Sequence, residues 1–331
     1  MKPSQLLSAL PKLVQAGHPT FIWGDPGIGK SDIVREVAAG LKIGLIDLRL
    51  TLYDPTDLKG YPVRSGSGTK EVMSFIPPAL LPTKGKGILF LDELPQAAPA
   101  TQAASYQLVL DRKLNEYKLP DGWQVIAAGN HARNGGVHHA MPPALANRFT
   151  HVTLTPNHAE WDDWARGKVD DLVRAYLRFR PAQLLDMEAR KAGIAYPTPR
   201  SWAKCGQILA QGHGVSTELE LLTGTIGEGA STELLAFIKT ARELPSLEEI
   251  LLSPDTAPVP VSPGAKYAVA TLLEGKASKT NIKQCLTYMG RLDKEYQTAF
   301  MHNITRTKRE LSSTKEYIDW CLANRELLGV G

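Results

Sequence analysis

The first part of the chain alternates short apolar runs with helical patterns. An apolar run at residues 20–23 leads into a glycine-rich turn, and behind it Ile33, Val34 and Val37 recur at helical spacing. A second apolar run follows at residues 43–48. The order strand, helix, strand predicts a βαβ unit with parallel strands.

Three further apolar runs continue this pattern, at residues 88–91, 125–128 and 152–154. Each has the length of a buried strand, and a helical pattern at residues 96–110 separates the first two. The segment 51–86 is instead rich in glycine and proline around two short extended stretches, which predicts an inserted hairpin and loop. We therefore expect an α/β domain over residues 1–155 with a parallel five-stranded sheet.

The pattern becomes helical after Pro156, with little strand signal up to about residue 250. This predicts an all-helical domain over residues 156–250. Residues 253–264 hold four prolines, which excludes a helix there and predicts an extended linker over residues 251–264. Residues 265–331 return to a helical pattern and are expected to form a helical C-terminal extension.

Composition excludes several classes of protein. The 331 residues are 43% hydrophobic and 22% charged, which are ordinary values for a globular chain and not for a disordered or fibrous one. The three cysteines, Cys205, Cys285 and Cys321, are far apart and support neither a disulfide framework nor a cysteine zinc site. A reducing, cytoplasmic location is expected.

Charge and hydropathy add two expectations about partners. No apolar run has the roughly 18 residues that a membrane span needs, and the N-terminal apolar stretch is too short for a signal peptide, so no membrane partner is expected. The net charge of +4 is spread along the chain. It is therefore weak evidence for a nucleic-acid partner.

The glycine-rich turn at residues 24–31 reads GDPGIGKS, a complete G-x-x-x-x-G-K-S pattern between a predicted strand and a predicted helix. Such glycines let backbone N–H groups surround phosphate oxygens, the helix N-terminus adds partial positive charge, and the lysine reaches the β and γ phosphates. The serine supplies a hydroxyl for Mg²⁺. The predicted nucleotide-binding residues are Gly24, Asp25, Pro26, Gly27, Ile28, Gly29, Lys30, Ser31 and Asp32.

A second chemical motif ends the apolar run at 88–91, where Asp92 and Glu93 follow in sequence. Side chains alternate along a strand, so the two carboxylates point in different directions and can hold different roles. We expect Asp92 to bind magnesium together with Ser31, and Glu93 to polarise the water that attacks the γ phosphate.

These motifs together resemble those of the AAA+ ATPases. The resemblance rests on GDPGIGKS and LFLDEL, joined to AAGN at residues 127–130 and ALANRF at residues 144–149, and it covers residues 1 to about 245. The stretch DPTDLKGYP at residues 54–62 is similar to the MoxR-type branch. The resemblance implies a P-loop NTPase (AAA+) core followed by a helical lid, Mg²⁺-dependent hydrolysis of ATP, and assembly into a homo-oligomeric ring, expected to be a hexamer.

The resemblance also implies roles for three further polar residues. Asn130 stands in the place of sensor 1, which orients the attacking water, and Arg200 in that of the sensor 2 arginine of the lid. Arg148 matches the arginine finger, which completes the site of the neighbouring subunit. Arg133 remains an alternative as a second arginine acting between subunits.

Two regions depart from the family pattern or distinguish its branch. The histidine-rich segment 131–140 invites a metal site together with His151, but no carboxylate or cysteine lies at ligand spacing, which favours a polar loop. The MoxR-type insertions correspond to residues 54–82 and 112–123. Their aromatic and basic side chains either bind a peptide or nucleic acid strand or pack within the hairpins, and both alternatives stay open. These side chains are those of Tyr61, Arg64, Lys70, Phe75, Lys113, Tyr117 and Lys118.

The leading functional hypothesis is an ATP-hydrolysing ring that remodels a protein partner in a chaperone-like way. A partner with a von Willebrand factor A domain is implied by the resemblance alone. A nucleic-acid motor is an alternative, which predicts ATPase stimulation by nucleic acid and steep salt dependence. A nucleotide-gated scaffold is another, and Glu93 argues against it because a pure switch does not need a carboxylate that activates water.

Overall fold

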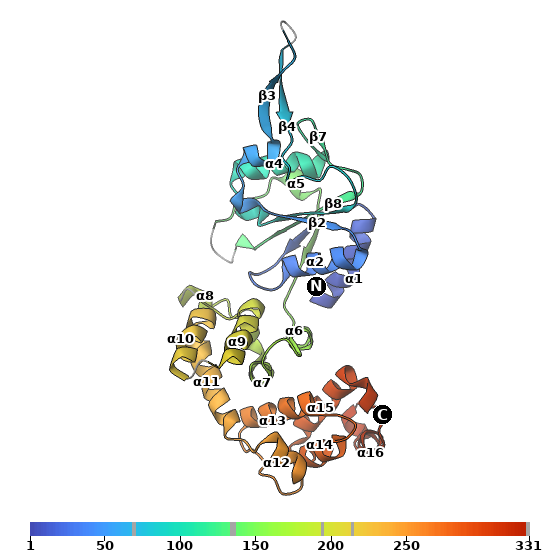
Figure 1. Cartoon of the computed structure of the whole chain (residues 1–331), viewed down its shortest axis with the longest axis vertical. Coiled ribbons are helices and arrows are strands. Elements are labelled where there is room, and N and C mark those ends of the chain that lie inside the picture. The colour runs from blue at the N-terminus through green and yellow to red at the C-terminus, as the bar shows by residue number, and fades with distance from the viewer. Residues whose placement is uncertain (68–70, 133–136, 193–194, 213–214, 329–331) are drawn as a thin grey trace. The chain divides into compact units, whose positions relative to one another are not determined.

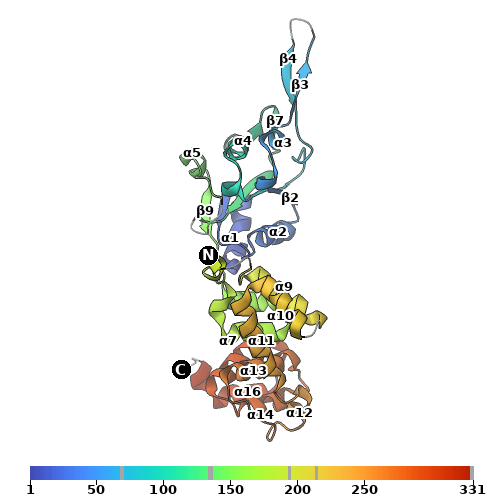
Figure 2. The same cartoon turned by 90° about the vertical axis from the view of Figure 1, so that its left-hand side faces the viewer.

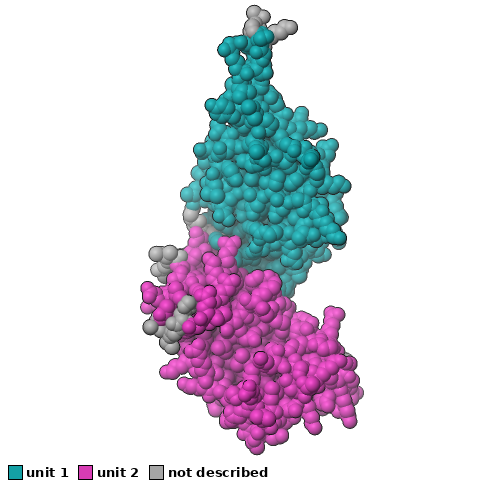
Figure 3. All heavy atoms as spheres, in the orientation of Figure 1, with its two compact units in different colours: residues 1–160 teal, residues 161–331 magenta. Residues whose placement is uncertain are grey.

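The computed structural model describes residues 1–67, 71–132, 137–192, 195–212 and 215–328. The chain divides into two compact units, residues 1–160 and residues 161–331, which Figure 3 colours separately. The division falls inside helix α6 (His158–Ala165).

The first unit is built on a five-stranded sheet in the order β2–β5–β8–β1–β9, in which every neighbouring pair of strands is parallel. This confirms the predicted fold class of an α/β domain with a parallel five-stranded sheet, followed by a helical second part. The strands of this sheet are β1 (Thr20–Trp23), β2 (Gly44–Arg49), β5 (Gly87–Asp92), β8 (Trp123–Gly129) and β9 (Thr150–Thr153).

Helices cover both faces of the sheet, as Figure 1 shows. All six residues of β5 are buried, as expected for a central parallel strand. Leu89 and Leu91 belong to a core shared with Leu108 of α4, whereas Ile88 and Phe90 alternate to the opposite face, where α2 packs. The helices of this unit are α1 (Pro3–Gln15), α2 (Lys30–Leu41), α3 (Pro55–Lys59), α4 (Pro99–Leu110) and α5 (Pro143–Ala146), with 3₁₀ turns η1 (Leu50–Leu52) and η3 (Leu94–Gln96).

Two antiparallel hairpins interrupt the α/β pattern in the segments where insertions were expected. The longer one, β3 (Tyr61–Ser65) with β4 (Val72–Ile76), extends away from the body of the unit (Figures 1 and 2). The shorter one pairs β6 (Lys113–Leu114) with β7 (Tyr117–Lys118). The Phe75 N–H donates to the Glu116 carboxylate at 3.3 Å, which links the two hairpins.

The second unit is helical and has two apolar cores. The first contains Tyr176 and Trp202, whose ring centroids lie 5.5 Å apart, and the second contains Tyr288 and Phe300. Among the described residues, no helix combines the length and the apolarity needed to cross a membrane. The helices are α7 (Asp171–Phe179), α8 (Ala189–Ala192), α9 (Pro199–Gln211), α10 (Val215–Ile226), α11 (Glu228–Arg242), α12 (Leu247–Leu252), α13 (Pro263–Lys276), α14 (Ile282–Met289), α15 (Lys294–Thr307) and α16 (Lys315–Ala323), with 3₁₀ turns η5 (Pro181–Leu184), η6 (Arg309–Leu311) and η7 (Arg325–Leu328).

The proline-rich segment between α12 and α13 is residues 253–262, shorter than the expected linker 251–264, because α12 ends at Leu252 and α13 begins at Pro263, where proline is tolerated in the first turn. The segment lies against α14. The Tyr288 hydroxyl donates to the Pro258 carbonyl at 2.7 Å, and the Arg291 guanidinium donates to the Ala257 carbonyl at 2.7 Å. Helix α13, which follows the segment, contributes Ala268 to the first core and Leu273 to the second. The two cores of this unit are therefore joined by a shared helix.

A buried network of charges fixes α13 against α6 and α7. Arg178 donates to Asp162 at 2.6 Å and to Glu274 at 2.7 Å, and Arg174 donates to Asp162 at 3.0 Å. The Asp162 and Glu274 side chains are 4% and 1% exposed. Burial by itself raises the pKa of Glu274, but Arg178 and then Arg166 outweigh it and lower this pKa overall.

Glu274→Gln is expected to destabilise the second unit by about 3–5 kcal/mol, because it leaves the Arg178 charge buried without one of its two carboxylates. Urea unfolding followed by tryptophan fluorescence measures the loss, and Glu220→Gln on an exposed position of α10 is the control.

The same network predicts a pH dependence. Since the pKa of Glu274 is lowered on folding, its stabilising contribution is complete above the unfolded value of about 4 and is lost as the pH falls through the folded value. Equal stability of the parent and Glu274→Gln at pH 7 would contradict this account.

Candidate functional site

The loop between β1 and α2 has the geometry of an anion site. Gly27 and Gly29 have φ of 73° and 95°, in the left-handed region that favours glycine. Gly29 is the N-cap of α2, so the free N–H groups of the first helical turn face the loop. The predicted residues from Gly24 to Ser31 lie in this loop and first turn. Asp32 is turned outward, where its carboxylate accepts from Arg35 at 2.7 Å.

Lys30 lies across the inside of the loop with only 8% of its surface exposed. Its ammonium donates to the carbonyls of Gly24 and Asp25 at 2.9 and 3.0 Å, and to Asn130 Oδ1 at 2.9 Å. Asn130 directly follows β8, the strand between β1 and β5. Lys30 and Asn130 are therefore 100 residues apart in sequence but meet at the carboxyl ends of β1 and β8.

Ser31 and Asp92 meet in the same region. The Ser31 hydroxyl donates to Asp92 Oδ2 at 2.8 Å, and the other carboxylate oxygen accepts the Glu93 N–H at 2.9 Å. Asp92 is 8% exposed. A hydroxyl and a carboxylate oxygen at this separation are the hard oxygen donors that Mg²⁺ prefers, and the residues therefore fit a magnesium ion.

Glu93 is held in an unusual conformation. Its φ of 58° lies in the left-handed region, which costs energy for a residue with a side chain and is often found at functional sites. The Thr51 hydroxyl donates to its carboxylate at 2.5 Å, and Arg49 Nε lies 3.7 Å from the other oxygen. Neither partner was predicted from the sequence. Arg49 is paired with Asp92 in the register of β2 and β5. Polar residues at the end of the predicted strand 43–48 were therefore the signal that could have identified these partners.

Arg148 lies apart from these groups, on the turn between α5 and β9. Its side chain is exposed, and within the described ranges it forms no ion pair and no side-chain hydrogen bond. Arg200 is the second residue of α9 in the second unit and is also exposed. The predicted contact of Arg200 with the γ phosphate stays a prediction, and Arg133 lies outside the described residues.

The side chains of His131, His138 and His151 lie around Trp23, the last residue of β1. His131 stacks on its indole at 5.5 Å between centroids and 14° between planes, and His138 lies at 6.4 Å. His151 accepts from the indole N–H at 2.9 Å. In the part of the chain that the structure describes, no group of three or more His, Cys, Asp and Glu side chains is arranged to hold a metal ion.

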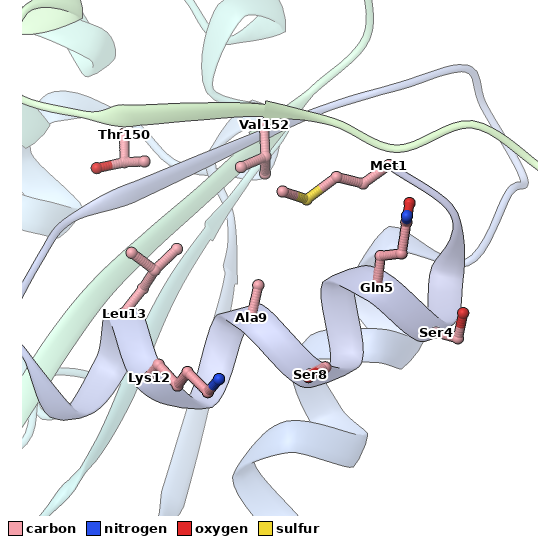
Figure 4. A pocket seen from close by; sticks show the side chains of 9 residues that line it. All are labelled: Met1, Ser4, Gln5, Ser8, Ala9, Lys12, Leu13, Thr150 and Val152. Atoms are coloured by element: carbon pink, nitrogen blue, oxygen red, sulfur yellow. The ribbon is translucent and has the colours of Figure 1, made fainter.

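A separate hollow of about 690 Å³ lies between α1 and β9 (Figure 4). Thr150 and Val152 face it from the strand, and Ala9 and Leu13 face it from the helix. It contains none of the predicted nucleotide-site residues.

Comparison with known proteins adds a family match over the sheet-containing unit. Residues 20–157 match the model of the family described as ATPase family associated with various cellular activities (AAA). A stretch of the chain is 25% identical over 162 residues to Midasin of Giardia intestinalis; the match covers 46% of this chain and 3% of that protein. The chain therefore spans only a small part of the length of this relative.

Two of the solved structures that align with this chain have low sequence identity to it. A mutant of Thermotoga maritima RuvB is 14% identical and aligns with a TM-score of 0.40 over 77% of this chain and 75% of its own. NtrX from Brucella abortus, solved in complex with ATP, is 15% identical and aligns with a TM-score of 0.42 over 99% of this chain and 68% of its own.

Proposed function

We propose that this chain, whose residues 20–157 form an AAA ATPase family domain, hydrolyses ATP as one subunit of a ring that remodels a protein partner. One observation carries the proposal. At a glycine-rich helix N-terminus, Lys30 meets Asn130 and Ser31 meets Asp92, so side chains that follow or end three different strands come together there. Glu93 directly follows Asp92 and donates its backbone N–H to the Asp92 carboxylate.

The loop would bind the triphosphate through its backbone N–H groups and Lys30. In the structure the Lys30 ammonium donates to oxygens of Gly24, Asp25 and Asn130. Phosphate oxygens can replace some of these acceptors, and the side-chain amide of Asn130 is the one that can turn away without moving the backbone. Asn130 would then be released to orient the attacking water.

The carboxylates divide the remaining chemistry between them. Ser31 and Asp92 would hold a magnesium ion, which neutralises charge on the phosphates when it is bound. Glu93 accepts the proton of the attacking water. Thr51 donates to one oxygen of the Glu93 carboxylate and Arg49 Nε lies 3.7 Å from the other, so the carboxylate is held in one orientation before the water arrives.

The ring is inferred from Arg148. This guanidinium is exposed on the edge-strand side of the sheet and contacts none of Lys30, Asp92 and Glu93 in its own described chain. An arginine that acts on the phosphates of a neighbouring copy needs this placement. We therefore propose a closed homo-oligomer, of six subunits by resemblance to the MoxR-type branch.

The nature of the partner is inferred from the β3–β4 hairpin. Tyr61 and Ile76 are directly paired and share one face with Val72 further along, and their exposed fractions are 73%, 57% and 60%. Exposed apolar side chains on one face favour a protein partner over a nucleic acid backbone. A von Willebrand factor A domain is the partner class that the resemblance suggests. Tyr117 of the shorter hairpin is buried and donates to the Pro82 carbonyl at 2.6 Å. Its side chain therefore packs inside the unit and is not exposed to a partner.

The proposal is tested with the purified chain and MgATP. We expect hydrolysis that rises with protein concentration as rings assemble, and stimulation by an unfolded model protein. Tyr61→Ser with Ile76→Ser should reduce that stimulation and leave unstimulated hydrolysis unchanged. Stimulation by single-stranded DNA instead, lost steeply with salt, would favour the nucleic-acid motor, and absence of any hydrolysis would refute the proposal.

A further inference from the structure

A hydrogen-bonded bridge through His151 connects two functional segments of the first unit. The Trp23 indole N–H donates to His151 Nδ1 at 2.9 Å, and His151 Nε2 lies 2.8 Å from the carbonyl oxygen of Ala146. Trp23 is the residue before the phosphate loop, and Ala146 ends α5 two residues before Arg148. The bridge spans 128 residues of sequence.

The chemistry of the two partners fixes the state of the His151 ring. An indole N–H is a donor only, so Nδ1 must carry a lone pair. A carbonyl oxygen is an acceptor only, so Nε2 must carry the proton. His151 is therefore neutral in this bridge, and a second proton on Nδ1 would place two N–H groups against each other and break the bond to Trp23.

The fold directs this ring toward Trp23. Thr150 and Val152 face the hollow beside α1 (Figure 4), and strand alternation sends the side chain between them to the opposite face of the sheet. There His151 lies near Phe21 and Phe149, at centroid distances of 5.7 and 6.3 Å.

The turn that carries Arg148 is held on both sides. On one side, the Ala146 carbonyl accepts from His151 and also from the Phe149 N–H at 3.2 Å. On the other side, the Phe149 ring is buried and packs edge to face on Phe21 at 5.5 Å. The Arg148 N–H itself donates to Leu145 O at 3.0 Å. Backbone freedom at Arg148 is thus limited by contacts that end at β1.

We infer that His151 is a positioning residue: its neutral ring ties the end of β1 at Trp23 to the end of α5 at Ala146 and so sets the direction of Arg148. This inference rests on the proposed function, in which Arg148 acts on a neighbouring copy. Its new element is a hydrogen-bonded connection between β1, which precedes the phosphate loop, and the turn that carries Arg148.

The inference predicts how His151→Ala behaves in mixed rings. In rings made of the variant alone, ATP hydrolysis should be roughly 10- to 100-fold slower than in the parent, because Arg148 is misplaced. The affinity of the variant's own site for MgATP should be unchanged. Lys30→Ala subunits cannot bind the nucleotide productively but retain Arg148, so adding them should restore part of the rate. His18→Ala, at an exposed position of the same unit, is the control.

A pH profile separates positioning from simple packing. The bridge requires a lone pair on His151 Nδ1, so acid should lower the turnover of the parent. The other imidazole rings that face the bridge in the described chain are those of His131 and His138, which flank Trp23. Arg148 keeps its charge at every pH of the assay. His151→Gln retains an N–H donor and an amide acceptor and cannot be protonated, so it should keep turnover near neutrality and flatten the acid side of the profile.

The outcomes are distinguishable from those of the proposed function. If the parent does not hydrolyse ATP, the proposed function fails. If the parent does hydrolyse it, an unchanged rate and profile in both His151 variants overturns this inference and leaves the function standing. Loss of MgATP affinity without rescue by Lys30→Ala also overturns it, because His151 would then act on its own site. Should His151→Ala not fold, Trp23→Phe in the same assays removes the same donor.

Discussion

Arg148→Ala is expected to lower the rate of ATP hydrolysis by roughly 10³- to 10⁵-fold, the range measured for arginine fingers. The physical reason is that the charge developing on the phosphate oxygens loses a guanidinium supplied by the adjacent copy. The affinity of each subunit for MgATP should hardly change, because Arg148 contacts none of the groups that bind the nucleotide in its own described chain. Steady-state phosphate release and a nucleotide-binding titration measure the two quantities.

Mixing experiments give this prediction its control. Arg148→Ala subunits have an intact nucleotide site and Lys30→Ala subunits have an intact arginine, so their mixture should hydrolyse ATP faster than either variant alone. Arg309→Ala, on an exposed position of the second unit, should behave as the parent. A complete lack of rescue, with rings formed in the mixture, would rule out an arginine that acts between subunits.

Glu93→Gln is expected to lower turnover by roughly 10²- to 10⁴-fold, as for the loss of a general base. The amide keeps the shape of the carboxylate and can still meet Thr51, but it cannot accept the proton of water. MgATP should therefore bind without being consumed, and the rings should accumulate in the ATP-bound state. Single-turnover phosphate release measures the chemical step directly.

An acidic residue of α3 gives the matched variant for this test. Asp57→Asn changes a carboxylate of the same unit that accepts the Asp54 N–H at 2.8 Å and lies outside the nucleotide site. Its turnover should remain within about twofold of the parent, a surface substitution having little effect on the chemistry. If Glu93→Gln turns over as fast as the parent, the assignment of the base is wrong.

Local patterns were sufficient to predict the sheet and the order of strand, turn and helix around the glycine-rich loop. The strand, the turn residues and the helix start that make the loop are contiguous in sequence, and Gly27 and Gly29 adopt the positive φ that glycine permits in such a turn. Each strand of the sheet is a separate apolar run, so its existence can be inferred without knowledge of its neighbours.

Long-range contacts could not be predicted in the same way. Thr51 and Glu93 are 42 residues apart and meet only because β2 pairs with β5. His151 and Trp23 meet only because β9 pairs with β1. A sequence of apolar runs does not state which strands are neighbours, and therefore it cannot name the partners that aim a catalytic side chain. Arg49 shows the same limit, because its role depends on the register against Asp92.

The central claim is that the loop following β1 binds the triphosphate of ATP with magnesium, and calorimetric titration of MgATP into Glu93→Gln tests it most directly. The account predicts saturable binding of MgATP to Glu93→Gln. This binding should be lost in the double variant that also carries Lys30→Ala, and it should weaken sharply when magnesium is chelated. A titration without binding, or one unaffected by Lys30→Ala, would contradict it.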